Sequence, residues 1–383
     1  MGNNKIYFKN LDSIRFIAAL LVYLEHGISP SYQYLPIKNT FWEKLLNIIR
    51  NDAADVSVFF VLSGFLITFL LINEHELNSK IALQNFYIRR ALRSWPLYFA
   101  VLLFSFLIYP LIASLMEINI QHASNIFYHL TFLSNFDVLH LFENNLGITN
   151  PMPQNITWSI SVEEQFYLFW PLIFVFLPKR FWLSVILISV LGSMVFRIIY
   201  YNDTWILYFH TFAVGLNLAI GALMAYLITK SSRINSFFEN CGTYSHLLLF
   251  LLLFCFLFWS KTLFAFKYGD AVSTLFISSS IALIIAAQAL TKSDSRLNMQ
   301  HLKFANKWGK YTYGIYVLHP IVLILMSLLV PLSPFATNNF VFTFSFGVIG
   351  FILTLFFSKL SYKYFESRFL VLKKRFTTVE THP

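Results

Sequence analysis

Residues 11–27 read LDSIRFIAALLVYLEHG, an apolar stretch that nevertheless carries Arg15, Glu25 and His26. A charged side chain near the middle of a membrane helix costs roughly 2.5–3.5 kcal/mol, so an ionisable residue there indicates a function. At about 100° per residue, the spacing of Arg15 and His26 brings both side chains to one helix face, about 16 Å apart along the axis. The stretch therefore predicts a membrane helix that forms one wall of a polar tunnel.

The whole chain is too apolar for a soluble protein. Of its 383 residues, 57% are hydrophobic and 12% are charged, and the mean hydropathy is +0.63. We predict an all-α fold, a polytopic membrane bundle of about ten transmembrane helices that forms a single domain over residues 1–383 without an additional soluble domain. The predicted helices are centred near Ala19, Leu62, Leu103, Trp170, Val190, Ala219, Leu253, Ile281, Ile321 and Gly350.

The distribution of Lys and Arg predicts the orientation. With the amino terminus placed in the cytoplasm, 21 of the 28 basic residues fall in inner segments, six fall in outer segments and Arg15 lies in the membrane. Cytoplasmic loops carry an excess of Lys and Arg, so we expect both termini to be cytoplasmic. The net charge of +10 is then explained by the basic residues of the cytoplasmic segments and does not indicate nucleic-acid binding. We expect no metal site.

A cluster of arginines precedes the third predicted helix, in the sequence NFYIRRALRSWPLYF. Arg90 and Arg93 are spaced to share one helix face, with Arg89 beside them. Such a cluster can simply anchor the helix at the cytoplasmic surface. It can equally bind phosphate, because guanidinium groups match phosphate oxygens. Spacing alone leaves both interpretations open.

The second predicted helix contains Ser63 and Gly64, a small pair that allows another backbone to approach closely. Helix packing is the simpler interpretation, and a ligand contact is the alternative.

The long outer segment, about residues 116–159, has no Lys or Arg and contains Glu117, Asp137 and Glu143. This composition favours a neutral or sugar-like partner over an anionic one. Glu163 and Glu164 follow at the outer entry of the next helix. They are placed to stabilise the helix start, but the aromatic run after them favours a functional site. Adjacent residues diverge by about 100°, so at most one should point into the bundle.

His319 lies in the ninth predicted helix, directly before Pro320. An isolated histidine in such a helix is typical of a structural hydrogen bond. We therefore expect its replacement to be silent, in contrast to that of His26.

Five motifs, in this order, resemble acyltransferase family 3, whose members modify bacterial surface glycans. They are Arg15 with His26, FFVLSGFLI at 59–67, RRALRSWPLYF at 89–99, TWSISVEEQFYLFWP at 157–171 and YTYGIYVLHP at 311–320. The resemblance covers essentially the whole chain.

The resemblance implies a multi-pass protein of the bacterial inner membrane, surrounded by lipid, that moves an acyl group from cytosolic acyl-CoA to a sugar hydroxyl on the outer face. Acetyl-CoA is the expected donor, and O-antigen, lipopolysaccharide or exopolysaccharide is the expected acceptor. Many members carry an esterase-like soluble domain, so the resemblance implies either work without one or a separate soluble partner.

By motif, His26 corresponds to the catalytic histidine of the family and Arg15 to its arginine partner. Arg90 and Arg93 correspond to an Arg-x-x-Arg pair, and Glu163 with Glu164 to an acidic position. Ser63 and Gly64, with the arginine cluster, are the further candidates for donor binding. A basic patch, a polar tunnel and ten helices would also suit a transporter or flippase for a glycan or small solute, although the two halves show no convincing repeat.

Overall fold

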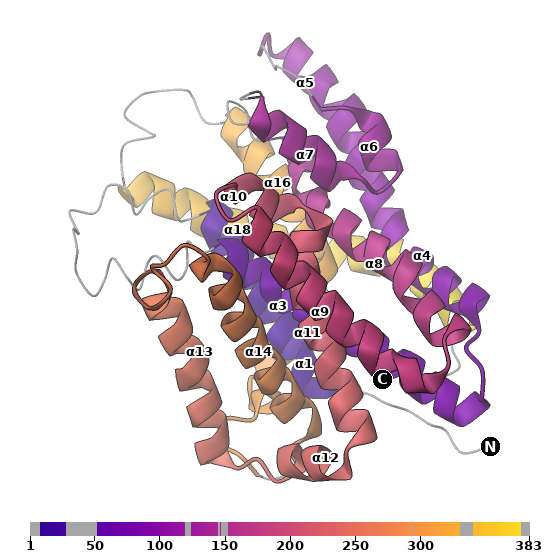
Figure 1. Cartoon of the computed structure of the whole chain (residues 1–383). Coiled ribbons are helices and arrows are strands. Elements are labelled where there is room, and N and C mark those ends of the chain that lie inside the picture. The colour runs from indigo at the N-terminus through magenta and orange to yellow at the C-terminus, as the bar shows by residue number, and fades with distance from the viewer. Residues whose placement is uncertain are drawn as a thin grey trace.

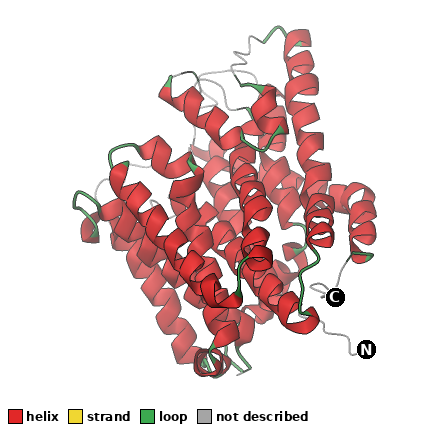
Figure 2. Cartoon of the chain, turned by 45° about the vertical axis from the view of Figure 1, so that its right-hand side comes forward, coloured by secondary structure: helices red, strands yellow, loops and turns green. Residues whose placement is uncertain are grey.

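The structure is a computed structural model that describes residues 8–27, 52–118, 124–144, 146, 152–292, 294–329 and 340–376. These residues form helices and no strand (Figure 2). The predicted all-α class is confirmed.

The long helices are α1 (Lys9–Gly27), α3 (Asp52–Asn78), α4 (Leu83–Leu103), α8 (Thr157–Phe176), α9 (Trp182–Ile199), α11 (Thr211–Lys230), α13 (Thr243–Leu263), α14 (Gly269–Leu290), α16 (Thr312–Leu329) and α18 (Phe340–Ser361). Shorter helices connect them: α5 (Tyr109–Leu115), α6 (Ile126–Leu130), α7 (Ser134–Glu143), α10 (Thr204–Phe209), α12 (Ser232–Glu239), α15 (Lys303–Gly309) and α19 (Ser367–Lys374). The π-helical segments Phe104–Ile108 and Tyr362–Glu366 join α4 to α5 and α18 to α19, and single 3₁₀ turns lie at Pro153–Ile156, Lys179–Phe181 and Met299–His301.

Within the described chain, eight helical segments are long and apolar enough to cross a membrane. The prediction of ten adds α1 and α8, which have suitable lengths of 19 and 20 residues but contain charged side chains, four in α1 and two in α8. These charges lower their apolar character, and they are the residues that suggested a function. The count of ten and the cytoplasmic location of both termini stay predictions.

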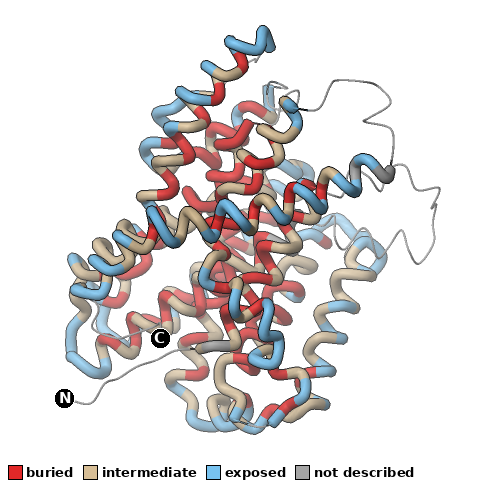
Figure 3. Tube along the Cα trace, turned by 180° about the vertical axis from the view of Figure 1, so that it is seen from behind, coloured by how far each residue is buried: buried red, intermediate tan, exposed pale blue. Residues whose placement is uncertain are grey.

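Helices α3 and α11 form the centre of the bundle. In the apolar 18-residue stretch of each of these segments, 61% is buried inside the protein, against 6% in that of α13. Buried residues concentrate along the middle of the molecule (Figure 3). The two helices touch backbone to backbone, because a Cβ added to Gly64 would lie 2.0 Å from the carbonyl oxygen of Leu218, and one added to Gly221 would lie 2.0 Å from that of Val61. Only glycine fits at such a crossing.

The short helices lie at opposite ends of the bundle. Helices α5, α6 and α7 form one end and α12 the other (Figure 1). Phe8, before α1, and Lys373, in α19, line one cavity. The two ends of the described chain therefore meet at the same place in the bundle.

Candidate active site

A cavity of about 200 Å³ opens between α1, α3, α4, α8, α16 and α19. Among the described residues that line it are four basic side chains and one acidic side chain: Arg15, Arg90, Arg93 and Lys373, with Glu163. Much of the remaining lining is apolar or aromatic. An excess of positive charge in such surroundings is costly unless an anion compensates it.

Helix α4 directs its three arginines in two directions. Arg90 and Arg93 line the cavity, with the Arg90 guanidinium 5.6 Å from the ring centre of Tyr167 and that of Arg93 6.0 Å from the ring centre of Tyr313. Within the described structure, the buried Nε atom of Arg90 has no hydrogen-bond partner. A buried donor without a partner costs about 1–3 kcal/mol, so this atom favours a bound acceptor.

Arg89 points away from the cavity. Its Nη2 atom lies 3.2 Å from Oε2 of Glu74, and Nη1 donates to the carbonyl oxygen of Phe376 at 2.8 Å. The predicted donor-binding role of Arg89 does not fit this position, because both contacts are structural.

Ser63 and Gly64, which we predicted as a pair, face different surroundings on α3. Ser63 lines the cavity, but Gly64 packs against the backbone of Leu218. Gly64 is not among the residues that line the cavity, and its lack of a side chain is needed for the helix crossing, so donor binding by Gly64 stays a prediction without support from its position. Helix packing, the simpler interpretation, is the one that fits.

Glu163 and Glu164 diverge as the helical phase predicts. Glu163 accepts from the Ser63 hydroxyl at 2.6 Å and the Tyr167 hydroxyl at 3.0 Å. Glu164 accepts from the Ser94 hydroxyl at 2.6 Å and the Trp95 indole at 3.0 Å. Glu163 alone of the two lines the cavity, where it lies with the cations of the predicted inner side and not beside His26.

Arg15 is held within its own helix. Its Nη1 atom lies 2.6 Å from Oδ1 of Asp12, one turn earlier, and the side chain lines the cavity. The first helix thus supplies one cation whose charge is already balanced by a neighbouring carboxylate.

His26, at the other end of α1, pairs with the histidine that we had considered structural. Nδ1 of His26 lies 3.0 Å from Nε2 of His319, and Nδ1 of His319 lies 3.2 Å from the carbonyl oxygen of Ile315. The rings stack with centres 5.1 Å apart. His319 is only 1% exposed, whereas His26 is exposed. His319 is therefore a buried support for an accessible His26, and it cannot serve as an independent control.

The contacts assign the protons of this pair. A carbonyl oxygen only accepts, so Nδ1 of His319 carries the hydrogen that is donated to Ile315. When both rings are neutral, Nε2 of His319 must accept from Nδ1–H of His26, and Nε2 of His26 becomes its basic nitrogen.

Tyr316 connects the cavity to the histidine pair. Its side chain lines the cavity, its ring centre lies 6.1 Å from that of His319, and its hydroxyl lies 2.6 Å from the Ser159 hydroxyl. Tyr316 and His319 are three positions apart on α16, so one helix face carries both. The sequence reasoning missed Tyr316 and Lys373, although the spacing within YTYGIYVLHP was a usable signal for Tyr316.

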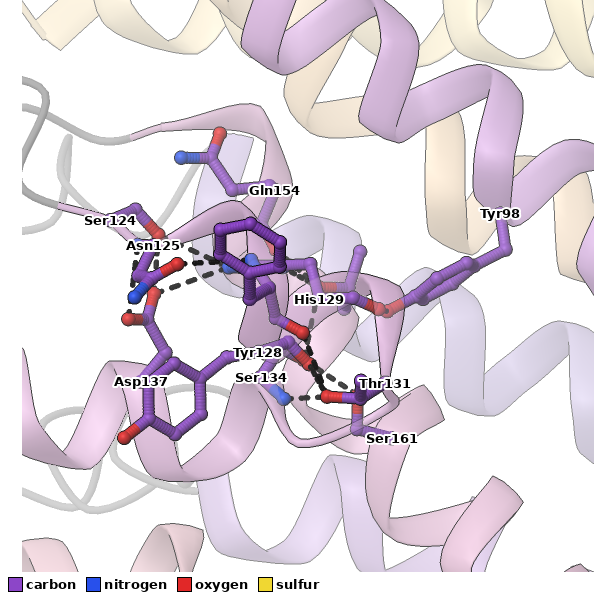
Figure 4. A network of polar contacts seen from close by, with 12 residues as sticks. Tyr98, Ser124, Asn125, Tyr128, His129, Thr131, Ser134, Asp137, Gln154 and Ser161 are labelled. Carbon is purple, nitrogen blue, oxygen red and sulfur yellow. Dashed lines mark hydrogen bonds and ion pairs between the residues drawn. The ribbon is translucent and has the colours of Figure 1, made fainter.

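A second polar cluster lies at the end of the bundle formed by α6 and α7 (Figure 4). His129 contacts Oδ2 of Asp137 at 3.2 Å through Nε2 and the Thr157 hydroxyl at 3.0 Å through Nδ1. Ser124 also binds Asp137, as does the backbone N–H of Asn125 at 3.1 Å.

Asp137 is 2% exposed, so its carboxylate does not contribute to the outer surface that we expect to meet a neutral or sugar-like partner. Burial raises the pKa of its carboxyl, but the hydrogen bonds from His129, Ser124 and Asn125 outweigh burial and hold this pKa below its usual value. The cluster ties the outer segment to Thr157, the first residue of α8, and so helps to position Glu163.

Comparisons with known proteins identify a matching family and several relatives. The profile of a family described as "Acyltransferase domain" matches residues 8–359. A protein of Staphylococcus aureus (strain COL), provisionally named an O-acetyltransferase, is 26% identical over 95% of this chain and 57% of its own length. Peptidoglycan O-acetyltransferase OatA of Listeria monocytogenes is 29% identical over 58% of this chain and 34% of its own length. The match thus covers little more than half of the length of the first relative and about a third of the second. No solved structure matches it.

Proposed function

Because the chain belongs to this acyltransferase family, we propose that it is an integral membrane O-acyltransferase, most simply an O-acetyltransferase. In this proposal it takes the acyl group from cytosolic acyl-CoA, with acetyl-CoA as the preferred donor, and transfers it to a hydroxyl of a surface glycan. The setting is the inner membrane of a bacterium, which the chain crosses several times.

The observation that carries the donor assignment is the position of Arg90 and Arg93 in the wall of the cavity. Coenzyme A bears several phosphate groups, which would supply the missing negative charge. Arg90 and Arg93 are the best phosphate ligands, because their planar forks match phosphate oxygens and the Arg90 Nε atom is a buried donor without a partner. A neutral sugar or an apolar solute would leave these charges uncompensated.

The acyl end of the donor has to reach the histidine pair. Tyr316 stands between them, lining the cavity on one side and lying next to His319 on the other. We infer that the thioester lies against Tyr316 while the phosphates bind Arg90 and Arg93. The Tyr316–Ser159 hydrogen bond would then fix the wall beside the thioester.

His26 is the base in the proposed reaction. Its Nε2 atom takes the proton of the sugar hydroxyl while the hydroxyl oxygen attacks the thioester carbonyl. The new C–O bond forms, the C–S bond breaks, and the thiolate leaving group takes the proton from His26 to give the free thiol. General-base catalysis of this kind contributes about 10²–10⁴-fold. His319 holds the His26 ring in the tautomer that leaves Nε2 able to accept.

The acceptor is proposed from two observations. The exposed residues of the outer segment include Glu117 and Glu143, and the segment has no Lys or Arg, so a neutral sugar is a better partner than an anionic one. Relatives are named peptidoglycan O-acetyltransferases. We therefore place peptidoglycan beside O-antigen, lipopolysaccharide and exopolysaccharide as candidate acceptors.

Two measurements test the proposal. Purified protein in lipid nanodiscs is incubated with radiolabelled acetyl-CoA and with glycan from cells that lack the gene, and labelled glycan is expected with wild type but not with His26→Ala. Surface glycan from cells with and without the gene is also compared for ester-linked acetate, which identifies the acceptor. Failure of the purified protein either to transfer or to hydrolyse acetyl-CoA would overturn the proposal and favour a transporter.

A further inference from the structure

We propose that Val56 and Phe60 of α3 close the acyl end of the donor cavity and so limit the transferred group to a short acyl chain such as acetyl. The inference rests on the proposed function and deepens it, since it names the residues that select the donor. It also gives a role to a second cavity that lies behind Phe60. Removing the Phe60 ring should join the two cavities and admit a longer acyl chain.

The second cavity has a volume of about 50 Å³ and adjoins the first. Val56 and Phe60 line both cavities, so these two side chains stand between them. Helix α8 continues this wall, because Ser159 lines the first cavity and its neighbour Trp158 lines the second. The ring centres of Phe60 and Trp158 lie 6.0 Å apart, and Phe60 is only 2% exposed. The wall is therefore closely packed.

This wall lies away from the arginines of α4. Ser63 lies at the level of Arg90, because both contact Tyr167. The Ser63 hydroxyl is 3.2 Å from that of Tyr167, and the Arg90 guanidinium is 5.6 Å from the Tyr167 ring centre. Val56 lies two turns further along α3, about 10 Å along the helix axis. A donor whose phosphates bind the arginines would thus extend toward Val56 and Phe60 with its acyl end.

The wall also adjoins Tyr316, against which we place the thioester. The Tyr316 hydroxyl lies 2.6 Å from that of Ser159, and its ring centre lies 5.5 Å from that of Phe59, the neighbour of Phe60. An acyl group held at Tyr316 would therefore have its hydrocarbon end beside the Phe60 ring.

The second cavity suits a hydrocarbon chain. Its lining is mainly apolar or aromatic and includes, besides the wall itself, Leu207, Tyr208, Val214 and Ile277. Polar groups in the lining have partners within the protein. Arg197 lies 2.6 Å from Oδ2 of Asp270, and the Thr274 hydroxyl donates to the Asp270 carbonyl oxygen at 2.9 Å. An acyl chain would leave these hydrogen bonds intact.

In the wild-type protein the Phe60 ring keeps an acyl chain out of this space. One methylene group more or less in an apolar pocket changes kcat/KM about 10- to 200-fold. A closed wall at the acyl end should therefore favour acetyl-CoA over acyl-CoA donors that are several carbons longer.

Phe60→Ala tests the inference, and Phe65→Ala is its matched control. Phe65 is a fully buried residue of the same helix, but it is not among the described residues that line either cavity. Both substitutions remove a buried ring and its packing, and only one of them opens the wall. We would measure kcat/KM in nanodiscs for radiolabelled acetyl-, butyryl- and hexanoyl-CoA, with glycan from cells that lack the gene as acceptor.

We expect wild type and Phe65→Ala to favour acetyl-CoA over hexanoyl-CoA at least 100-fold, and Phe60→Ala to reduce this preference at least 10-fold. Val214→Phe, added to Phe60→Ala, should restore the preference, because it places a ring in the second cavity from α11. An unchanged preference in Phe60→Ala would overturn the inference and leave the proposed function standing. If wild type used none of the three donors, the proposed function would fail as well.

A second measurement needs no variant and remains available if Phe60→Ala does not fold. Wild-type protein is tested with acetyl-, propionyl-, butyryl- and hexanoyl-CoA. The value of kcat/KM should fall steeply with the first added carbons, because the chain meets the wall. Equal values for all four donors would contradict the inference.

Discussion

The Nδ1 atom of His26 lies 3.0 Å from the Nε2 atom of His319, although the two residues are 293 positions apart in the chain. His319 is anchored in turn to the carbonyl oxygen of its own helix at Ile315. The chain of hydrogen bonds leaves one nitrogen of the accessible histidine available as a base. A buried residue thus fixes the proton distribution of an exposed one.

Replacing His319 by Ala should reduce acyl transfer about 10- to 100-fold, less than the loss of about 10²–10⁴-fold expected for His26→Ala. His319 acts through His26, so kcat should fall while the KM for acetyl-CoA changes little. Steady-state kinetics in nanodiscs provide the measurement.

The matched control for this prediction is His140→Ala, since His140 is exposed on α7 and bonds Asn144. It should retain wild-type kinetics. A His319→Ala protein with full kcat would show that the histidine pair does not set the tautomer of His26.

Replacing the arginines of α4 should have two different effects, one on coenzyme A binding and one on thermal stability. Arg90→Ala combined with Arg93→Ala should weaken coenzyme A binding at least 10-fold and leave pantetheine binding unchanged, because the lost contacts are to phosphate. Arg89→Ala should mainly lower Tm by several degrees, because it leaves the buried Glu74 carboxylate without its partner. Calorimetry and thermal unfolding distinguish the two classes, with the exposed Arg180→Ala as control. If the double variant lost pantetheine binding as much as coenzyme A binding, Arg90 and Arg93 would have a structural role and would not bind phosphate.

Gly64→Ala should destabilise the protein by about 1–3 kcal/mol, because its Cβ would lie 2.0 Å from the Leu218 carbonyl oxygen and force α3 and α11 apart. Gly192→Ala is the control, since a Cβ there would meet nothing within 4 Å. Thermal unfolding in detergent compares the two. A Gly64→Ala protein as stable as Gly192→Ala would contradict the close crossing.

Helical periodicity predicted relationships within one helix better than relationships between helices. The divergence of Glu163 from Glu164 and the shared face of Arg90 and Arg93 follow from about 100° per residue, and the structure shows both. The His26–His319 contact joins α1 to α16, and no local pattern specifies which helices pack together. For this reason His319 was interpreted as an isolated structural residue.

Charge patterns had a similar limit. In the sequence, Arg89 could not be distinguished from Arg90 and Arg93 as a candidate for donor binding, and only the packing of α4 against α3 and α19 shows that Arg89 bonds Glu74 and the carbonyl oxygen of Phe376. Composition likewise does not reveal that Asp137 is buried, because the sequence does not show that His129, Ser124 and Asn125 surround it. Local sequence predicts the residue types of a site, and the tertiary fold decides which of them meet.

Asp137 should make the outer segment sensitive to acid. Its carboxyl pKa is held below the usual value of 3.8 in the folded protein. The stabilisation is therefore fully present above that pH and is lost as the pH falls through the lower folded value. Hydrogen exchange of residues 126–143, measured from pH 6 to pH 3, should show wild type opening at the acid end.

Asp137→Asn should exchange faster than wild type already at pH 6 and should lack the acid-dependent component, while Glu143→Gln, an exposed substitution on α7, should follow wild type. An Asp137→Asn profile parallel to wild type across this range would show that another carboxyl group controls the transition.

Membrane orientation is tested by single cysteines introduced into a variant from which Cys241 and Cys255 have been removed. Glu143 and Lys303 are both exposed, and they lie in segments that the distribution of basic residues assigns to opposite sides. Glu143→Cys should react with a membrane-impermeant maleimide added to intact cells, whereas Lys303→Cys should react only after the membrane is opened. Because Arg90, Arg93 and Lys373 share the inner side with Lys303 in this scheme, the same experiment tests access of a cytosolic donor to the cavity. The reverse labelling pattern would place the cationic cavity on the outer side and would exclude cytosolic acyl-CoA as its ligand.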